Sequence, residues 1–180
     1  ASAFGAALVD ADGHIGYKRR TRLAPAAVSG PKRTPQTDTE VPALSGAAMM
    51  VRRAAFEAVG GFDPAIFLYY EDDDLSVRLR AACGPLIFVP SAIATHFSGK
   101  SSAPSPELSR FKGYHWARSR IYTARKHGLA APWLAGLRNA VWQVVGPRAW
   151  GSAERRAEGW GRLKGVWSMC NRNNRYPRLH

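Results

Sequence analysis

The chain has 180 residues, 46% of them hydrophobic, and a formal net charge of +13 at pH 7. This length and apolar content are typical of a globular protein with a hydrophobic core, which excludes a disordered polypeptide. Its two cysteines, Cys83 and Cys170, lack the spacing of a metal site or a disulfide framework, so we expect a reducing, cytoplasmic setting.

The positive charge is concentrated in the C-terminal part of the sequence. Up to His96 there are 10 basic and 10 acidic residues; from Phe97 onward lie the other 16 of the 26 Lys and Arg and only 3 of the 13 Asp and Glu. The chain therefore combines a neutral part with a basic part. This differs from a uniformly basic protein that binds nucleic acid.

The N-terminal segment is predicted to form a strand over Ala3–Val9 and a turn over residues 10–13. It lacks the charged start and the uninterrupted apolar run of a signal peptide. Residues 16–40 combine six basic residues with three prolines, which is typical of a surface loop. We expect solvated charges in this loop in preference to a role in binding an anion.

Residues 41–51 are predicted to form a strand that enters the core, with Ser45 and Gly46 at a point of close approach. A short helix is predicted over residues 52–59, because two glycines follow it as a C-terminal stop. Phe62, directly after these glycines, is expected to fill the core.

Four consecutive acidic residues, Glu71 to Asp74, precede a segment in which Leu75, Leu79 and Ala82 fall on one face of a helix. Carboxylates in a first helical turn cap the helix and complement its dipole. Four of them exceed that need, and their mutual repulsion calls for a cation or hydrogen-bond donors. Composition alone leaves a capped helix and a site of chemistry equally open.

After a break at Gly84 and Pro85, short β segments are predicted over residues 86–89 and 93–96, with a turn at Pro90. A lone histidine at a strand end, such as His96, is more often structural than a ligand. Residues 97–109 are rich in Ser, Pro and Gly and are predicted to form a flexible lid. Lys100 in this lid has two open interpretations, a contact with a diphosphate or a solvated side chain.

Three helices are predicted in the basic part, over residues 106–127, 132–145 and 153–169. The two later helices and their connection carry Trp133, Trp142, Trp150, Trp160 and Trp167. Tryptophan with arginine on amphipathic helices is typical of surfaces that meet anionic lipids. The alternative is that the tryptophans pack these helices on one another or on a further part of the protein. No run of residues is apolar enough to span a bilayer.

Several motifs occur in an order and spacing that resembles the second half of glycosyltransferase family 2, in particular its rhamnosyltransferase-like and galactofuranosyltransferase-like members. The most specific stretch runs from Gly60 to His96. The motifs are Ser-Gly-Ala-Ala-Met-Met-Val-Arg-Arg at 45–53, Phe-Glu-Ala-Val-Gly-Gly-Phe-Asp at 56–63, Phe-Leu-Tyr-Tyr-Glu-Asp-Asp-Asp-Leu at 67–75, Arg-Leu-Arg at 78–80, Val-Pro at 89–90 and Thr-His at 95–96.

This resemblance implies an α/β fold, the C-terminal part of a GT-A glycosyltransferase domain with a mixed sheet, followed by basic amphipathic helices. It implies that residues 1–105 form the acceptor-side, catalytic half, that the nucleotide-binding half is missing, and that residues 106–180 are a Trp-rich helical extension. The family's metal-binding Asp-x-Asp lies upstream, so Asp10 and Asp12 are not assigned to it.

The resemblance also implies the reaction, which is transfer of a sugar from a nucleoside-diphosphate donor to a hydroxyl, with inversion. Asp72 matches the catalytic base, Glu71 would orient the acceptor, and Asp74 is left to cap the helix. His96 matches a ligand of a divalent metal, Mg²⁺ or Mn²⁺. Further residues expected to bind substrate are Ser45, Gly46, Ala47, Tyr70 and Lys100.

The implied partners are the sugar donor, a hydroxyl acceptor such as a lipid-linked glycan of the cell envelope, and an anionic membrane surface. The protein is expected to be cytoplasmic and peripheral on the inner face of the membrane. The alternative interpretation is a basic module that binds nucleic acid or a membrane surface without catalysis, because the sequence pI is about 10.6.

Overall fold

The computed structural model describes residues 1–25, 28–97 and 103–170, so Lys100 and the centre of the predicted lid lie outside the described residues. The chain forms two compact units. Unit 1 comprises Ala1–Asp63 and Glu71–Ser102, and unit 2 comprises Pro64–Tyr70 and Ala103–His180. The assignment of residues 64–70 to unit 2 was not anticipated from the sequence, and the predicted boundary at residue 105 stays a prediction.

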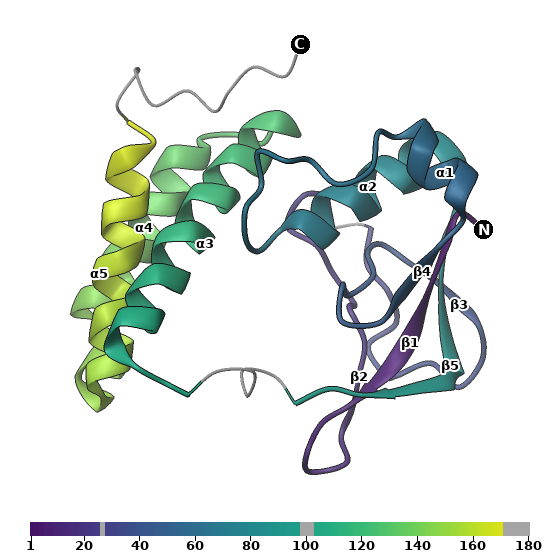
Figure 1. The fold of residues 1–180 in the computed structure, drawn as a ribbon, viewed down its shortest axis with the longest axis horizontal. Coiled ribbons are helices and arrows are strands. Elements are labelled where there is room, and N and C mark those ends of the chain that lie inside the picture. Colours follow the sequence, from purple (N-terminus) through teal and green to yellow (C-terminus); the bar gives the residue numbers. More distant parts are fainter. Residues whose placement is uncertain (26–27, 98–102, 171–180) are drawn as a thin grey trace. The chain divides into compact units, whose positions relative to one another are not determined.

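Unit 1 is built on a mixed sheet in the order β2-β1-β5-β3, with β4 also paired to β1 (Figure 1). Strand β1 runs parallel to β5, whereas its pairings with β2 and β4, and that of β3 with β5, are antiparallel. The predicted mixed α/β architecture is therefore confirmed. The strands are β1 (Ala3–Val9), β2 (Ile15–Gly16), β3 (Thr39–Val41), β4 (Met49–Val51) and β5 (Leu86–Thr95).

Two helices of unit 1, α1 (Arg53–Ala58) and α2 (Glu71–Cys83), contribute to its hydrophobic core. On α2, Leu75 and Leu79 are completely buried, as their helical spacing predicted, whereas Ala82, predicted on the same face, is exposed. The two leucines pack with alternate residues of the small, apolar strand β1, where Ala3 and Ala7 also have no exposed surface. The packing of α2 on the sheet thus fixes the position of the acidic first turn.

Three predictions for unit 1 were wrong in detail. Residues 41–51 form two short strands joined by a loop, because backbone N–H groups of that loop bond to side chains of α2 and not to a sheet partner. Phe62 is 47% exposed and contacts the ring of Phe56 edge-on. Strand β5 continues through Pro90, where its register against β1 shifts, since proline has no N–H to donate to the sheet.

Asp74, expected at the helix cap, is completely buried and forms an ion pair with Arg78, with 2.8 Å between guanidinium nitrogen and carboxylate oxygen. Arg78 also donates hydrogen bonds to the carbonyl oxygens of Val59 and Gly61, at 2.7 and 2.8 Å. These carbonyls follow α1, so one buried side-chain pair joins the end of α1 to the first turn of α2.

Unit 2 contains the three predicted helices, α3 (Pro106–Lys126), α4 (Pro132–Val145) and α5 (Ala153–Ser168), with a 3-10 turn η1 (Pro147–Gly151) before α5 (Figure 1). Ser105 and Ser152 cap α3 and α5, because each side chain accepts a hydrogen bond from a backbone N–H in the first turn. Ala117, Ile121, Ala140 and Val166 form the core between the helices.

The face of α5 that packs on its neighbours is rich in glycine, with Ala157 and Val166 beside three glycines. A Cβ atom on Gly161 or Gly165 would collide with the carbonyl oxygens of Arg110 or Tyr114 on α3, and one on Gly159 would lie 2.7 Å from that of Gln143 on α4. The helix backbones therefore approach so closely that only glycine fits at these positions. The two tryptophans of α5, Trp160 and Trp167, are exposed on another face.

Replacement of Gly161 by alanine is expected to lower the free energy of unfolding of unit 2 by about 2 kcal/mol, because the new methyl group has to displace backbone atoms of α3. Gly136→Ala on α4 is the matched control. Its Cβ would meet side-chain atoms and no backbone, those of Ile121 at 3.1 Å and of Val166 at 3.7 Å, so we expect a change within about 1 kcal/mol. Urea unfolding followed by circular dichroism measures both; equal effects would contradict the close packing.

Among the described residues, no helix is both long and apolar enough to cross a membrane.

Candidate active site

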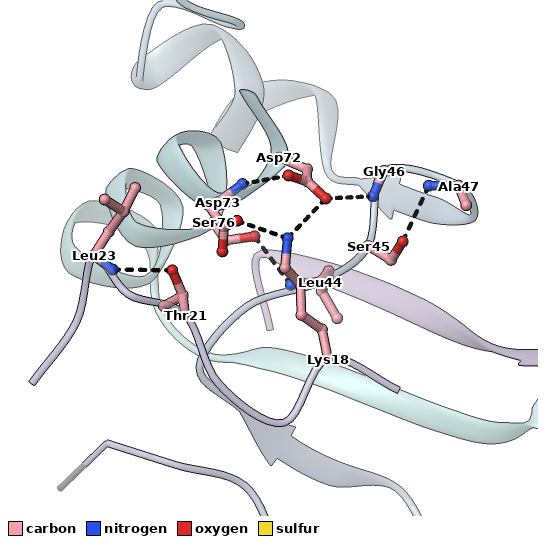
Figure 2. Close-up of polar contacts among 10 residues, drawn as sticks. All are labelled: Lys18, Thr21, Leu23, Leu44, Ser45, Gly46, Ala47, Asp72, Asp73 and Ser76. Atoms are coloured by element: carbon pink, nitrogen blue, oxygen red, sulfur yellow. Dashed lines mark hydrogen bonds and ion pairs between the residues drawn. The ribbon is translucent and has the colours of Figure 1, made fainter. Parts of the chain in front are cut away.

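The carboxylate of Asp72 lies in the first turn of α2 and is held by three donors (Figure 2). Its Oδ2 atom accepts hydrogen bonds from the backbone N–H of Gly46, at 3.0 Å, and from Nζ of Lys18, at 2.8 Å. Its Oδ1 atom accepts one from the backbone N–H of Asp73, at 2.8 Å. These bonds come from separate segments, so the orientation of the carboxylate is fixed by the fold of unit 1.

The loop before β4 is held against α2 by two hydrogen bonds. The buried Leu44 donates its backbone N–H to Oγ of Ser76 at 3.0 Å, and Gly46 reaches Asp72 one turn earlier on the helix (Figure 2). A Cβ on Gly46 would lie 3.3 Å from that of Asp72, so glycine allows the close approach expected at this position. Oγ of Ser45 accepts a hydrogen bond from the N–H of Ala47.

Lys18 is the main residue of this site that the sequence analysis missed. Its ammonium group forms ion pairs with Asp72 at 2.8 Å and with Asp73 at 2.9 Å (Figure 2). Burial opposes the charged form of Lys18, but the attraction of Asp73 and Asp72 prevails and raises its pKa. The only signal in the sequence was the cluster of basic residues in the 16–40 loop, which we expected to be solvated.

Glu71 and Asp73 each have a buried carboxylate oxygen, Oε2 and Oδ1, that accepts no hydrogen bond from any residue in the described parts of the chain. Burial raises the pKa of both carboxyl groups; for Asp73 the nearby Lys18 ammonium opposes this shift. One lysine thus faces three acidic groups of the first turn. The site retains capacity for a further donor, such as a substrate hydroxyl.

Glu71→Gln is expected to raise the free energy of unfolding at neutral pH. The folded protein binds the Glu71 proton more tightly than the unfolded chain does, so this group stabilises the fold below its ordinary pKa. That stabilisation is lost as the pH rises through the raised pKa. The difference between variant and wild type should therefore grow from about pH 4 to pH 7. Urea unfolding across this pH range measures this difference. A difference in the free energy of unfolding that does not change with pH would refute the raised pKa of Glu71.

His96 follows β5 and donates its backbone N–H to the carbonyl oxygen of Val9 at 2.9 Å. It is exposed and lines a hollow of about 420 Å³ together with Lys18, Ser45, Asp10 and His14. Lys18 contacts Asp72 directly, so one continuous region of unit 1 carries both residues that the resemblance assigned. His96 and Asp10 both line this hollow, and imidazole nitrogen and carboxylate oxygen are ligand types that divalent metals accept.

Asp10, Asp12 and His14 form an exposed cluster in the turn between β1 and β2, with one ligand atom of each within 4.8 Å of the others. Oδ1 of Asp10 accepts hydrogen bonds from the backbone N–H groups of Asp12 and His14, both at 2.9 Å. The aspartate therefore has a structural part in shaping the turn.

For two of the predicted substrate residues, Tyr70 and Lys100, the substrate-binding role stays a prediction. Tyr70 belongs to unit 2, where its ring packs against Trp116 with 5.8 Å between ring centroids. Lys100 lies outside the described residues. Gly46 contacts Asp72 directly, Ser45 and Ala47 share its loop, and Glu71 adjoins it at the start of α2, so these residues are brought together.

The profile of the family described as "Glycosyltransferase like family 2" matches residues 26–116. The chain belongs to this family. The matched segment includes the Ser45–Ala47 loop, the acidic first turn of α2 and His96, which confirms the resemblance drawn from the sequence motifs.

Two relatives of this family 2 chain carry rhamnosyltransferase names. The chain is 39% identical over 106 residues to N-acetylglucosaminyl-diphospho-decaprenol L-rhamnosyltransferase of Mycobacterium tuberculosis, covering 59% of this chain and 32% of the relative. It is 35% identical over 100 residues to the rhamnosyltransferase WbbL of Escherichia coli strain K12, covering 56% of this chain and 37% of that relative. The chain thus spans about a third of the length of the relatives it matches.

Among solved structures, the family 2 chain is similar to the crystal structure of GalNAc-T7 with UDP, GalNAc and Mn²⁺. The TM-score is 0.47 at 13% sequence identity, and the match covers 97% of this chain and 36% of the other.

Proposed function

We propose that this chain is the catalytic, acceptor-side part of an inverting glycosyltransferase of cell-envelope glycan synthesis. It transfers a sugar, rhamnose in the first instance, from a nucleoside-diphosphate donor to a hydroxyl of a lipid-linked acceptor. Family membership and the rhamnosyltransferase names of two relatives support the reaction class. The observation that carries the proposal is the carboxylate of Asp72, held by Gly46 and Lys18 at the start of α2.

Asp72 takes the proton of the acceptor hydroxyl. A carboxylate has about four lone-pair sites, and three of those on Asp72 are occupied by Gly46, Lys18 and Asp73, so one site on Oδ1 remains for the hydroxyl. The acceptor oxygen bonds to the anomeric carbon while the bond from that carbon to the diphosphate oxygen breaks on the opposite face. The proton goes to Asp72, and the configuration at the anomeric carbon inverts.

The neighbouring residues position the reacting groups. Lys18 holds Asp72 in place and balances part of the negative charge of the acidic turn. Glu71 has a buried oxygen free of hydrogen bonds from the described residues, so it accepts one from a second acceptor hydroxyl and orients the sugar. The loop Ser45–Ala47 borders the acceptor.

His96 would supply one ligand of a divalent metal, Mg²⁺ or Mn²⁺, which would neutralise the charge that develops on the leaving diphosphate. The exposed imidazole in the hollow that also contains Lys18 and Ser45 supports this role.

The transfer takes place at the cytoplasmic face of the membrane, where a lipid-linked acceptor is held. The name of the mycobacterial relative includes such an acceptor, N-acetylglucosaminyl-diphospho-decaprenol, and supports this location.

The test is a transfer assay with the full-length protein, Mn²⁺, a panel of nucleoside-diphosphate sugars and a synthetic prenyl-diphosphate N-acetylglucosamine. We expect one donor to give a new glycosidic bond whose anomeric configuration, measured by NMR, is opposite to that of the donor. A product with retained configuration would contradict inversion. No transfer from any donor of the panel, with a folded protein, would contradict the proposed acceptor class.

A further inference from the structure

Four tryptophans of unit 2, Trp142, Trp150, Trp160 and Trp167, are between 57% and 78% exposed. The other two, Trp116 and Trp133, pack against the helical core. The expected packing of the helices on one another is therefore correct for Trp133 and wrong for the four exposed ones, for which packing on a further part of the protein stays a prediction. Exposed tryptophan is uncommon on a soluble surface, and a group of four indicates an interaction site.

On α5, the outward face alternates basic and aromatic side chains. Arg156, Trp160, Lys164 and Trp167 follow one another at spacings of four, four and three residues, and all four are exposed. The inward face holds the glycines that contact α3 and α4. The exposed tryptophans depart from the usual amphipathic pattern, in which large apolar side chains face the core.

On α4, a second exposed stripe contains Leu134, Arg138, Val141, Trp142 and Val145, which also share one face of the helix. The two stripes meet at a hollow of about 300 Å³ that Val145 of α4, Trp150 of η1, and Arg156 and Trp160 of α5 line together. They form one surface, the tryptophan face, which consists of Leu134, Arg138, Val141, Trp142, Val145, Trp150, Arg156, Trp160, Lys164 and Trp167.

We infer that the tryptophan face docks on an anionic lipid bilayer. The tryptophan rings lie at the level of the headgroups, the aliphatic side chains of α4 reach the acyl chains, and the basic side chains contact lipid phosphates. The inference deepens the proposed function, on which its biological role rests, because it assigns the surface by which the enzyme meets a lipid-linked acceptor.

The mixture of side chains favours lipid over other partners. The buried centre of a protein interface is depleted of charged residues, whereas Arg156 and Lys164 alternate with Trp160 and Trp167 along α5. A groove for single-stranded nucleic acid uses aromatic and basic groups, but it gives no role to aliphatic side chains such as Leu134 and Val145, which are 62% and 63% exposed.

The test is co-sedimentation of the full-length protein with lipid vesicles, without donor or acceptor. One preparation is pure phosphatidylcholine, and the other also contains about 30% of the anionic lipid phosphatidylglycerol, to which each basic side chain at the surface should add about tenfold or less in affinity. Wild type should bind the anionic vesicles at least about 10-fold more tightly than the pure phosphatidylcholine vesicles. Trp160→Ser with Trp167→Ser should weaken this binding by at least about 10-fold, and Arg156→Gln with Lys164→Gln by about 30-fold.

The matched control is Arg52→Gln with Arg53→Gln, which removes the same charge from exposed positions of unit 1 and should leave vesicle binding unchanged. Equal losses for the control and face variants, or no loss for the tryptophan pair, would overturn the inference. Binding to single-stranded DNA with a steep salt dependence and none to vesicles would assign the face to nucleic acid instead.

Vesicle binding and transfer can fail separately. The Asp72→Asn protein should bind vesicles like wild type, because the tryptophan face belongs to unit 2. Wild-type protein that binds vesicles but transfers no sugar would contradict the proposed function alone. Wild-type protein that transfers sugar but does not bind vesicles would contradict the docking surface alone.

Discussion

Asp72→Asn is expected to lower kcat for sugar transfer by about 10²-fold to 10⁴-fold. Asparagine keeps the shape of the side chain, and its amide oxygen can still accept the hydrogen bond from Gly46. The amide cannot take the proton of the acceptor hydroxyl, so the loss should appear in kcat with little change in the KM for the donor. Steady-state transfer assays measure both constants.

The matched control for this variant is Asp38→Asn, which removes the same charge from an exposed position of unit 1. Its kcat should equal that of wild type. Near-normal kcat for Asp72→Asn, with unchanged thermal unfolding, would remove Asp72 as the base.

Asp74→Ala is expected to lower the free energy of unfolding of unit 1 by about 3 kcal/mol or more. The carboxylate has no exposed surface, and its loss leaves the largely buried Arg78 guanidinium without its counter-ion. The link from α2 to the carbonyls of Val59 and Gly61 depends on the position of that guanidinium. Urea unfolding with linear extrapolation measures the change.

The chain offers an exposed pair with the same helical spacing as a control. Arg53 and Glu57 also form an ion pair at 2.8 Å, but their side chains are 91% and 61% exposed. Water solvates both groups after a substitution, so Glu57→Ala should change the free energy of unfolding by about 0.5 kcal/mol or less. Similar effects of Asp74→Ala and Glu57→Ala would show that burial of the Asp74–Arg78 pair adds nothing to the free energy of unfolding.

Sequence patterns predicted those parts of the fold whose signals are local. The apolar, small residues of Ala3–Val9 indicated a strand, and the spacing of Leu75 and Leu79 defined the packing face of α2. The helices of unit 2 were predicted within one or two residues of their observed bounds, because proline, serine and glycine mark their ends. Residues 64–70 were not assigned to unit 2, since no local pattern indicates that Phe67 contacts Phe111 and His115.

The candidate site was only partly predictable. The run of four acidic residues marked the turn, but it did not distinguish Asp72, which accepts hydrogen bonds from Gly46 and Lys18, from Asp74, which is buried with Arg78. Lys18 lies 54 residues before Asp72, and nothing in the periodicity of the 16–40 loop separates it from the other basic residues there. Such pairing depends on how the loop passes over α2, which is a property of the folded chain.

The most direct test of the catalytic assignment is a crystal structure of the full-length protein with a nucleoside diphosphate and an unreactive acceptor analogue. We predict that the acceptor hydroxyl oxygen lies within about 3.2 Å of a carboxylate oxygen of Asp72. We also predict that Gly46 still donates its N–H to that side chain. An acceptor hydroxyl bound next to another carboxylate, with Asp72 still fully occupied by Lys18 and backbone donors, would contradict the assignment.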